Sequence, residues 1–255
     1  ELASLDGHTD SVNSASFSPD GHKIVTASDD GSVKVWDLAG NELASLDGHT
    51  VLVYSAVFSP DGQQIVTAGE DGSAKVWDID GNELATLYGH TGWIRSARFS
   101  PDGQRIVTAS EDGSARVWDV YGNEQAYLAG HTASVLSAGF SPDGQQIITA
   151  SEDGSARVWD IGGNELASLD GHTDAVRAAE FSPDGQQIVT ASGDGSAKVW
   201  RTYPTIEDKL ELARARLSAG FTDEECRRFF RDNLEICPRE LDQLFALFDD
   251  DLQTP

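Results

Sequence analysis

A set of short motifs recurs five times within residues 1–200, and this repeat constrains the fold more than any other feature. Successive copies are offset by 41 residues without an insertion, as the step from Trp36 to Trp77 shows. Internal repeats of about 20–50 residues are typical of architectures in which each copy packs on its neighbours. Gly-His begins at Gly7, Gly48, Gly89, Gly130 and Gly171, Phe-Ser-Pro-Asp-Gly at Phe17, Phe58, Phe99, Phe140 and Phe181, and Trp stands at 36, 77, 118, 159 and 200.

Each copy is predicted to form four short strands. In the first copy the strands cover residues 12–17, 23–27, a segment ending at Trp36, and 43–46. The Ser-Pro-Asp-Gly segment at 18–21 has turn chemistry, since Pro presets φ and Gly accepts a positive φ. Asp30-Gly31 is a strong hairpin signal. Because Gly or Pro interrupts the apolar pattern so often, no helical period fits residues 1–200, and we expect an all-β fold there.

These motifs and their spacing resemble the WD-repeat family, whose repeats of about 40–45 residues each build one blade of a β-propeller. The resemblance covers residues 1–200 and implies five four-stranded blades. It also implies that the Leu-Ala-Ser-Leu segment before each Gly-His is the outer strand of the preceding blade. The chain starts with such a segment at residues 1–5 and its last repeat stops at Trp200. We therefore expect an all-β propeller that the N-terminal strand closes by completing the fifth blade.

Two other arrangements remain open for a chain with five repeats. Propellers contain about 4–8 blades, and five require a steep turn between neighbours. The chain could instead pair with a second chain into a larger ring, or form the last part of a longer array. The absence of Met, with Glu1 as the first residue, indicates a piece of a longer protein.

The five Gly-His histidines are expected to be structural. The resemblance implies that each bonds a Ser or Thr of the second strand, the turn Asp and the Trp of the third strand. A metal site is the alternative, and it is much less favoured. Ser28 competes with Thr26 for this role, but Gly69 replaces Ser28 in the second copy, which favours Thr. The five sets are His8, Thr26, Asp30, Trp36; His49, Thr67, Asp71, Trp77; His90, Thr108, Asp112, Trp118; His131, Thr149, Asp153, Trp159; and His172, Thr190, Asp194, Trp200.

No catalytic motif stands out in the sequence. There is no Gly-rich phosphate loop and no His-Glu-x-x-His, and neither Cys lies near a His. Paired carboxylates such as Asp29-Asp30 recur at the turns and are interpreted as turn residues. We therefore predict a protein that is not an enzyme and that needs no cofactor or metal, although an active site assembled from several blades remains an alternative.

Positions that differ between the copies predict a binding face. They cluster where the first strand of each copy begins, and in the WD-repeat family these positions surround one mouth of the central channel. Trp, Tyr and Arg dominate interface hot spots, and an apolar cluster with a polar rim is a binding-site signature. Neutral divergence of duplicated blades is the alternative. The predicted partner-binding residues are Leu52, Tyr54, Trp93, Arg95, Leu136, Arg177 and Asn13, and the predicted rim is Asp29, Glu70, Glu111, Glu152 and Gly193.

The position just before each Phe also varies from copy to copy. It holds Ser16, Val57, Arg98, Gly139 and Glu180.

Residues 201–255 are predicted to form a separate linker and helical appendage. After a linker at 201–204, helices are expected at residues 205–218, from Thr222, and from Pro238. The segments around residues 212–213, 221–229 and 237–238 are similar to the tails of bacterial multi-domain WD-repeat signalling proteins. Cys226 and Cys237 are expected to be helix-packing thiols, with a disulfide as the alternative.

Charge limits the partners. The chain has 43 acidic and 18 basic side chains, for a formal charge of −25. Such a field repels nucleic acid and anionic membranes and favours a basic protein or peptide partner. Two Cys indicate a reducing, cytoplasmic setting.

The predicted function is a non-enzymatic scaffold or sensor module of a larger bacterial signalling or defence protein. One alternative is an assembly platform in which several chains complete rings, which would make the protein a homo-oligomer. Another is a lectin-like propeller that binds a small ligand.

Overall fold

The computed structural model describes residues 1–202, which form one compact unit. The helices predicted between residues 205 and 255, and both cysteines, lie outside the described residues. Among the described residues, no helix is long and apolar enough to cross a membrane.

The described residues form five antiparallel sheets, which we call blades 1 to 5 in chain order. The first strands are β1 (Val12–Phe17), β5 (Val53–Phe58), β9 (Ile94–Phe99), β13 (Val135–Phe140) and β17 (Val176–Phe181). The second strands are β2 (Lys23–Ser28), β6 (Gln64–Gly69), β10 (Arg105–Ser110), β14 (Gln146–Ser151) and β18 (Gln187–Ser192). The third strands are β3 (Val33–Asp37), β7 (Ala74–Asp78), β11 (Ser114–Asp119), β15 (Ser155–Asp160) and β19 (Ala197–Arg201). The fourth strands are β4 (Glu42–Leu46), β8 (Glu83–Leu87), β12 (Glu124–Ala129) and β16 (Glu165–Asp170).

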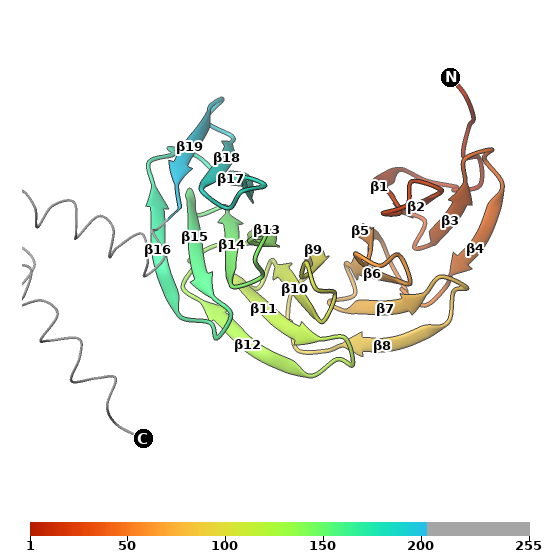
Figure 1. Cartoon of the computed structure of the whole chain (residues 1–255), viewed down its shortest axis with the longest axis horizontal. Helices are drawn as coiled ribbons and strands as arrows, with labels where there is room; N and C mark the ends of the chain where they lie inside the picture. The colour runs from red at the N-terminus through yellow and green to blue at the C-terminus, as the bar shows by residue number, and fades with distance from the viewer. Residues whose placement is uncertain (203–255) are drawn as a thin grey trace, which may run out of the picture. The chain divides into compact units, whose positions relative to one another are not determined.

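The blades stand side by side around an arc, with the first strands on its inner side (Figure 1). Contacts between β1 and β5, β5 and β9, β9 and β13, and β13 and β17 hold these inner strands together. The fourth strands lie on the outer side of the arc. The predicted all-β blades and the order of their strands are therefore found in the structure.

The turns follow the chemistry of the repeat. Between the first and second strands of blade 1, the amide of Lys23 donates a hydrogen bond to the Ser18 hydroxyl at 2.9 Å, and Gly21 has a φ of 71°. Between the third and fourth strands, the Asp37 carboxylate accepts the amide of Asn41 at 2.9 Å and its side-chain amide at 2.8 Å. The Asp that follows each Trp therefore shapes the turn into the fourth strand.

The hydrophobic core is divided among the junctions between neighbouring blades. In the first junction, Val25 and Val35 of blade 1 pack with Val53, Ile65 and Trp77 of blade 2, and all five side chains are buried. Equivalent clusters fill the next three junctions. Each blade thus buries its apolar faces against the blades on either side.

The predicted closure of the ring by the N-terminal strand is not found among the described residues. The sheet of blade 5 has three strands within the described residues, and residues 1–5 form no strand with β19. Blade 1 and blade 5 stand at opposite ends of the arc, with an opening between them (Figure 1).

Candidate functional site

The predicted partner-binding residues lie where the inner strands begin. In every blade a main-chain bond ties this end of the strand to the residue before the turn Asp. The amide of Glu70 donates to the carbonyl of Leu52 at 2.9 Å, and the amide of Glu111 donates to that of Trp93 at 2.9 Å. The acidic rim and the variable strand residues therefore lie together at one end of each blade, which we call the strand-start face.

Blades 2 and 3 bring three of the predicted residues into one cluster. The Arg95 guanidinium lies 4.4 Å from the ring centre of Tyr54 and 5.3 Å from that of Trp93. The two aromatic rings are 6.1 Å apart, with their planes at 33°. Arg95 also pairs with Glu111, to which its Nε donates at 2.7 Å. We call Tyr54, Trp93, Arg95 and Glu111 the aromatic–arginine cluster.

The cluster joins neighbouring blades while keeping part of its apolar surface in solvent. Tyr54 is half-buried on β5, whereas Trp93 precedes β9 and keeps 39% of its surface exposed. Burial raises the pKa of Tyr54, Arg95 opposes that change, and Glu70 adds to it. The phenol therefore stays protonated at neutral pH and can donate a hydrogen bond.

Asn13 takes in blade 1 the position that Arg95 takes in blade 3. Its side-chain amide donates to Asp29 at 2.6 Å and to the carbonyl of Val53 at 3.0 Å. The residue before the turn Asp thus pairs with this strand position in both blades. In blade 5 the residue before the turn Asp is Gly193, and Arg177 takes the position of Arg95. Arg177 is exposed and makes no ion pair within residues 1–202.

Leu52 takes in blade 2 the position that Trp93 takes in blade 3, and Leu136 takes in blade 4 the position of Arg95; both leucines are half-buried. Neither belongs to the buried core clusters of the described residues. Together with Arg177 they extend the strand-start face beyond the aromatic–arginine cluster.

The five histidine sets form hydrogen-bonded networks in all blades. The Nδ1 of His90 lies 2.8 Å from Asp112, and its Nε2 lies 2.7 Å from the Thr108 hydroxyl. The indole of Trp118 donates to that hydroxyl at 2.9 Å, and so bonds Thr108 rather than the histidine. The same bonds recur in blades 1, 2, 4 and 5, at His8, His49, His131 and His172.

Proton counting fixes the direction of each bond. A carboxylate accepts only, so the neutral histidine carries its proton on Nδ1 and donates to Asp112. Its Nε2 then accepts the single proton of Thr108, whose oxygen is free to accept from Trp118. In each network the indole, the hydroxyl and the imidazole each donate one hydrogen bond. Because these donors all have an acceptor, the polar groups can be buried between the strands.

The protonation equilibria agree with this assignment. Burial would raise the pKa of Asp112, but hydrogen bonds from His90 and Ser114 hold it well below its usual range. The pKa values of Asp30, Asp71, Asp153 and Asp194 are lowered in the same way. Burial lowers the pKa of His131, against the effect of its bond to Asp153. In blade 4, ionised Asp153 beside neutral His131 is therefore the favoured state.

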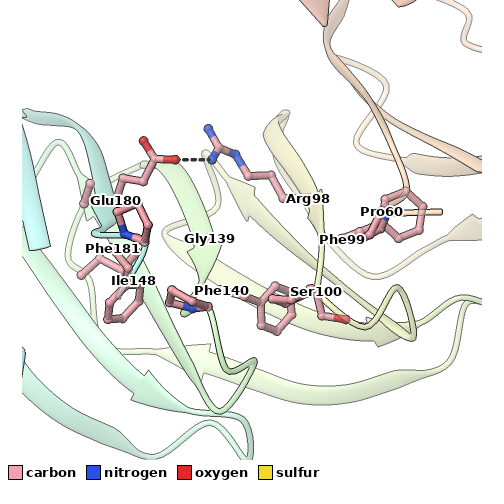
Figure 2. A pocket seen from close by; sticks show the side chains of 13 residues that line it. Pro60, Arg98, Phe99, Ser100, Gly139, Phe140, Ile148, Glu180 and Phe181 are labelled. Atoms are coloured by element: carbon pink, nitrogen blue, oxygen red, sulfur yellow. Dashed lines mark ion pairs between the residues drawn. The ribbon is translucent and has the colours of Figure 1, made fainter. Parts of the chain in front are cut away.

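A hollow that the sequence did not predict lies at the end of the inner strands opposite to the strand-start face. Its volume is about 330 Å³, and the repeated Phe and Pro residues of blades 2 to 5 line it (Figure 2). Arg98 of blade 3 and Glu180 of blade 5 face each other across it, 3.6 Å apart. Gly139 of blade 4 lies between them, and a Cβ added there would contact nothing within 4 Å. The sequence signal that could have revealed this hollow is the variable position before each Phe.

The two ends of the inner strands differ in the ligands that they suit. Each inner strand has six residues, so the strand-start face and the hollow are separated by about 17 Å. The hollow is walled by repeated apolar residues under one ion pair, whereas the strand-start face carries aromatic rings and several carboxylates. Within residues 1–202 no group of three or more His, Cys, Asp or Glu residues is placed to hold a metal ion.

Comparison with known proteins places the repeats in a family. The family described as "WD domain, G-beta repeat" matches the chain five times, at residues 1–37, 40–78, 81–119, 122–160 and 163–201. Periodic tryptophan protein 2 of Saccharomyces cerevisiae is 62% identical to this chain over 32 residues. Those residues make up 12% of this chain and 4% of the yeast protein, so the chain spans a small part of that relative.

Proposed function

Because the chain belongs to the WD40 repeat family, we propose that it is a non-enzymatic interaction module that binds a protein or peptide partner at its strand-start face. WD40 repeats generally mediate protein–protein interaction, and the repeats cover most of this chain. The observation that carries the proposal is the aromatic–arginine cluster, in which Tyr54 and Trp93 flank Arg95 beside Glu111. Trp, Tyr and Arg are the residue types that most often dominate binding energy at interfaces.

The charge of the site favours a basic partner. Carboxylates of Asp29, Glu70, Glu111 and Glu152 border the strand-start face, and the chain carries a formal charge of −25. An approaching Arg or Lys would meet two aromatic faces that already accommodate a guanidinium, because Arg95 lies against both. A partner cation could therefore take the place of Arg95 over the rings while Arg95 stays paired with Glu111.

The test is a binding assay with defined peptides. Basic peptides carrying a single Arg or Lys are compared with acidic peptides of equal length by fluorescence anisotropy. Trp93→Ala and Tyr54→Ala should each weaken binding of the basic peptides by about tenfold or more, as expected for hot-spot residues. Tyr121→Ala is the matched control, because Tyr121 is an exposed aromatic residue in the turn between β11 and β12. Equal binding by Trp93→Ala, or equal binding of acidic peptides, would refute the proposal.

A lectin-like function for small ligands is less favoured. Such a propeller would present one matching pocket per blade, whereas the strand-start positions hold Asn13, Tyr54, Arg95, Leu136 and Arg177 in the five blades.

We further propose that the module serves a larger bacterial signalling or defence protein in the cytoplasm. The similarity of residues 212–238 to tails of such proteins supports this setting, and the low Cys content supports a reducing compartment.

A further inference from the structure

The hollow opposite the strand-start face combines an apolar wall with two charged side chains. Phe99, Phe140 and Phe181 line it, together with the prolines of the same turns. The lining also includes the Ser100 hydroxyl, which accepts the amide of Arg105 at 2.9 Å and donates to Asp102. Because this hydroxyl is already bonded, the wall offers a ligand an apolar surface.

The wall is held in shape by contacts between successive turns. A Cβ built on Gly103 would lie 3.6 Å from the ring of Pro60, and one built on Gly144 would lie 3.6 Å from that of Pro101. Each proline ring therefore lies within van der Waals range of the turn of the next blade. A site that already has its bound shape costs less free energy to occupy.

The two charged side chains in the lining face each other over this wall. Arg98 of β9 and Glu180 of β17 approach to 3.6 Å, which is longer than a hydrogen bond (Figure 2). Within the described residues 49% of the Arg98 side chain and 71% of the Glu180 side chain are exposed. Such an exposed ion pair contributes little to stability, so a ligand can separate its two groups at little cost.

A glycine leaves room between the two charges. Gly139 of β13 holds in blade 4 the position that Arg98 holds in blade 3 and Glu180 in blade 5. A Cβ added to Gly139 would meet nothing within 4 Å. The strand that separates the two charged groups thus places no side chain in the space beneath them.

We propose that the hollow binds a free α-amino acid with an apolar side chain. The ligand carboxylate accepts hydrogen bonds from the guanidinium of Arg98, and the ligand ammonium donates to the carboxylate of Glu180. The apolar side chain enters the hollow among the phenylalanine and proline rings. One carbon joins the ammonium and the carboxylate of an α-amino acid, so the two groups can reach two protein charges that lie a few ångströms apart.

Charge complementarity favours this class over other small ligands. A ligand with a carboxylate alone would place it close to Glu180 and would meet the field of a chain with a formal charge of −25. A ligand with an ammonium alone would draw Glu180 away and leave Arg98 without its partner. A zwitterion has no net charge and satisfies both groups. This site is separate from the strand-start face, and the inference does not depend on the partner proposed there.

Calorimetric titration of the full chain tests the ligand class with four probes. L-Phenylalanine should bind with one molecule per chain. N-Acetyl-L-phenylalanine lacks the ammonium, L-phenylalaninamide lacks the carboxylate, and L-serine lacks the apolar side chain. Each should bind about tenfold more weakly or worse, because each loses a charged hydrogen bond or the apolar burial. Equal binding of any of the three would overturn the inference, as would no binding of phenylalanine up to about 10 mM, a weak affinity even for a ligand of this size.

Substitutions assign each ligand group to its residue. Arg98→Gln should weaken phenylalanine binding by about tenfold or more and should abolish the preference for phenylalanine over its amide. Glu180→Gln should abolish the preference over the N-acetyl derivative in the same way. Arg177→Gln is the matched control, because Arg177 is an exposed arginine at the other end of β17, and it should leave phenylalanine binding unchanged.

Gly139→Val tests the space itself. The side chain added to β13 should reduce phenylalanine binding at least tenfold by filling the hollow, and thermal unfolding checks that the variant still folds. Full binding by folded Gly139→Val, or retention of both preferences by Arg98→Gln and Glu180→Gln, would place the amino acid elsewhere and overturn the inference.

Discussion

Thr108 and its counterparts show how much a single hydroxyl can organise in this molecule. The Thr108 oxygen accepts a hydrogen bond from the indole of Trp118, and its hydroxyl donates one to Nε2 of His90. The Nδ1 of His90 in turn donates a hydrogen bond to Asp112. Four residues far apart in sequence are joined by three hydrogen bonds, and the threonine and tryptophan at the centre are buried. Because a buried donor or acceptor without a partner costs free energy, losing any one member penalises the others.

The carboxylate of this network makes stability depend on pH. The folded protein holds the pKa of Asp112 below its ordinary value of 3.8. A lowered pKa in the folded state contributes stability that is present above the ordinary value and is lost as the pH falls through the folded value. In blade 4 the histidine acts in the same direction, because burial lowers the pKa of His131 and the unfolded chain therefore takes up this proton first as the pH falls below about 6.5.

Asp112→Asn should therefore destabilise the protein in a pH-dependent way. At pH 7 the variant is expected to lose about 1.5–3 kcal/mol, the range for hydrogen bonds to a charged group. The difference from the unmodified chain should shrink as the pH falls from about 5 to below 3, because protonation removes the advantage of the carboxylate. Urea denaturation at several pH values measures it, with Asp80→Asn in an exposed turn as the control. A difference that stays constant with pH would contradict the assigned ionised state.

The repeat predicted the residue-scale network better than it predicted the candidate site. The resemblance to WD repeats implied that His90, Thr108, Asp112 and Trp118 lie together in one blade, and the structure joins them. The aromatic–arginine cluster depends on packing between blades, because Tyr54 belongs to blade 2 and Arg95 to blade 3. A repeat pattern marks both positions as variable but carries no information on the angle at which two blades meet.

At the scale of elements, two glycines of the blades differ in what their lack of a side chain permits. Gly81, in the turn between β7 and β8, has a φ of 94°, and a Cβ there would lie 2.9 Å from the carbonyl of Ser45. Gly139 lies within β13 beside the hollow, and an added Cβ would meet nothing within 4 Å. Gly81 permits blades to approach each other, whereas Gly139 leaves space at a ligand-sized cavity.

These two positions form a matched pair for substitution by alanine. Gly81→Ala should cost about 1–3 kcal/mol, because it combines a strained backbone with a close approach of neighbouring main chain. Gly139→Ala should be neutral or slightly stabilising, since Gly weakens a strand interior. Thermal unfolding of both variants gives the comparison. If Gly81→Ala proved as stable as Gly139→Ala, the tight seating of each outer strand on the next blade would be wrong.

The element order was predictable because each strand and turn is encoded within one copy. The Asp-Gly turns, the alternation of the second strand and the Trp of the third are local features, and the 19 observed strands follow them. Ring closure was not predictable from such features. It depends on how neighbouring blades pack at each junction, where side chains such as Val35 and Trp77 meet, and their apolar character alone does not set that packing.

At the scale of the whole molecule, stability should vary along the arc. Val107 of blade 3 is fully buried in a junction, whereas Val189 holds the same position on the open face of blade 5. In a repeat protein, stability is close to a sum over units and the interfaces between neighbours. The same substitution should therefore have different effects in the middle and at the end.

Val107→Ala and Val189→Ala measure this difference. Val107→Ala should cost about 2 kcal/mol from lost burial alone, whereas Val189→Ala should cost well under about 1 kcal/mol at low protein concentration, as for a half-exposed side chain. Urea unfolding at low and high protein concentration is the measurement. Equal costs at both positions in dilute solution would contradict an open arc.

The sameness of the four junctions has a genetic consequence. Each junction buries equivalent side chains on its two sides, so any blade is a suitable neighbour for any other. Recombination that removes or adds one 41-residue unit in frame joins surfaces that already fit. The number of blades can therefore change in a single step, without compensating mutations, while the residues of each strand-start position travel with their blade. An array of this kind can vary the order of its recognition residues as readily as it varies its length.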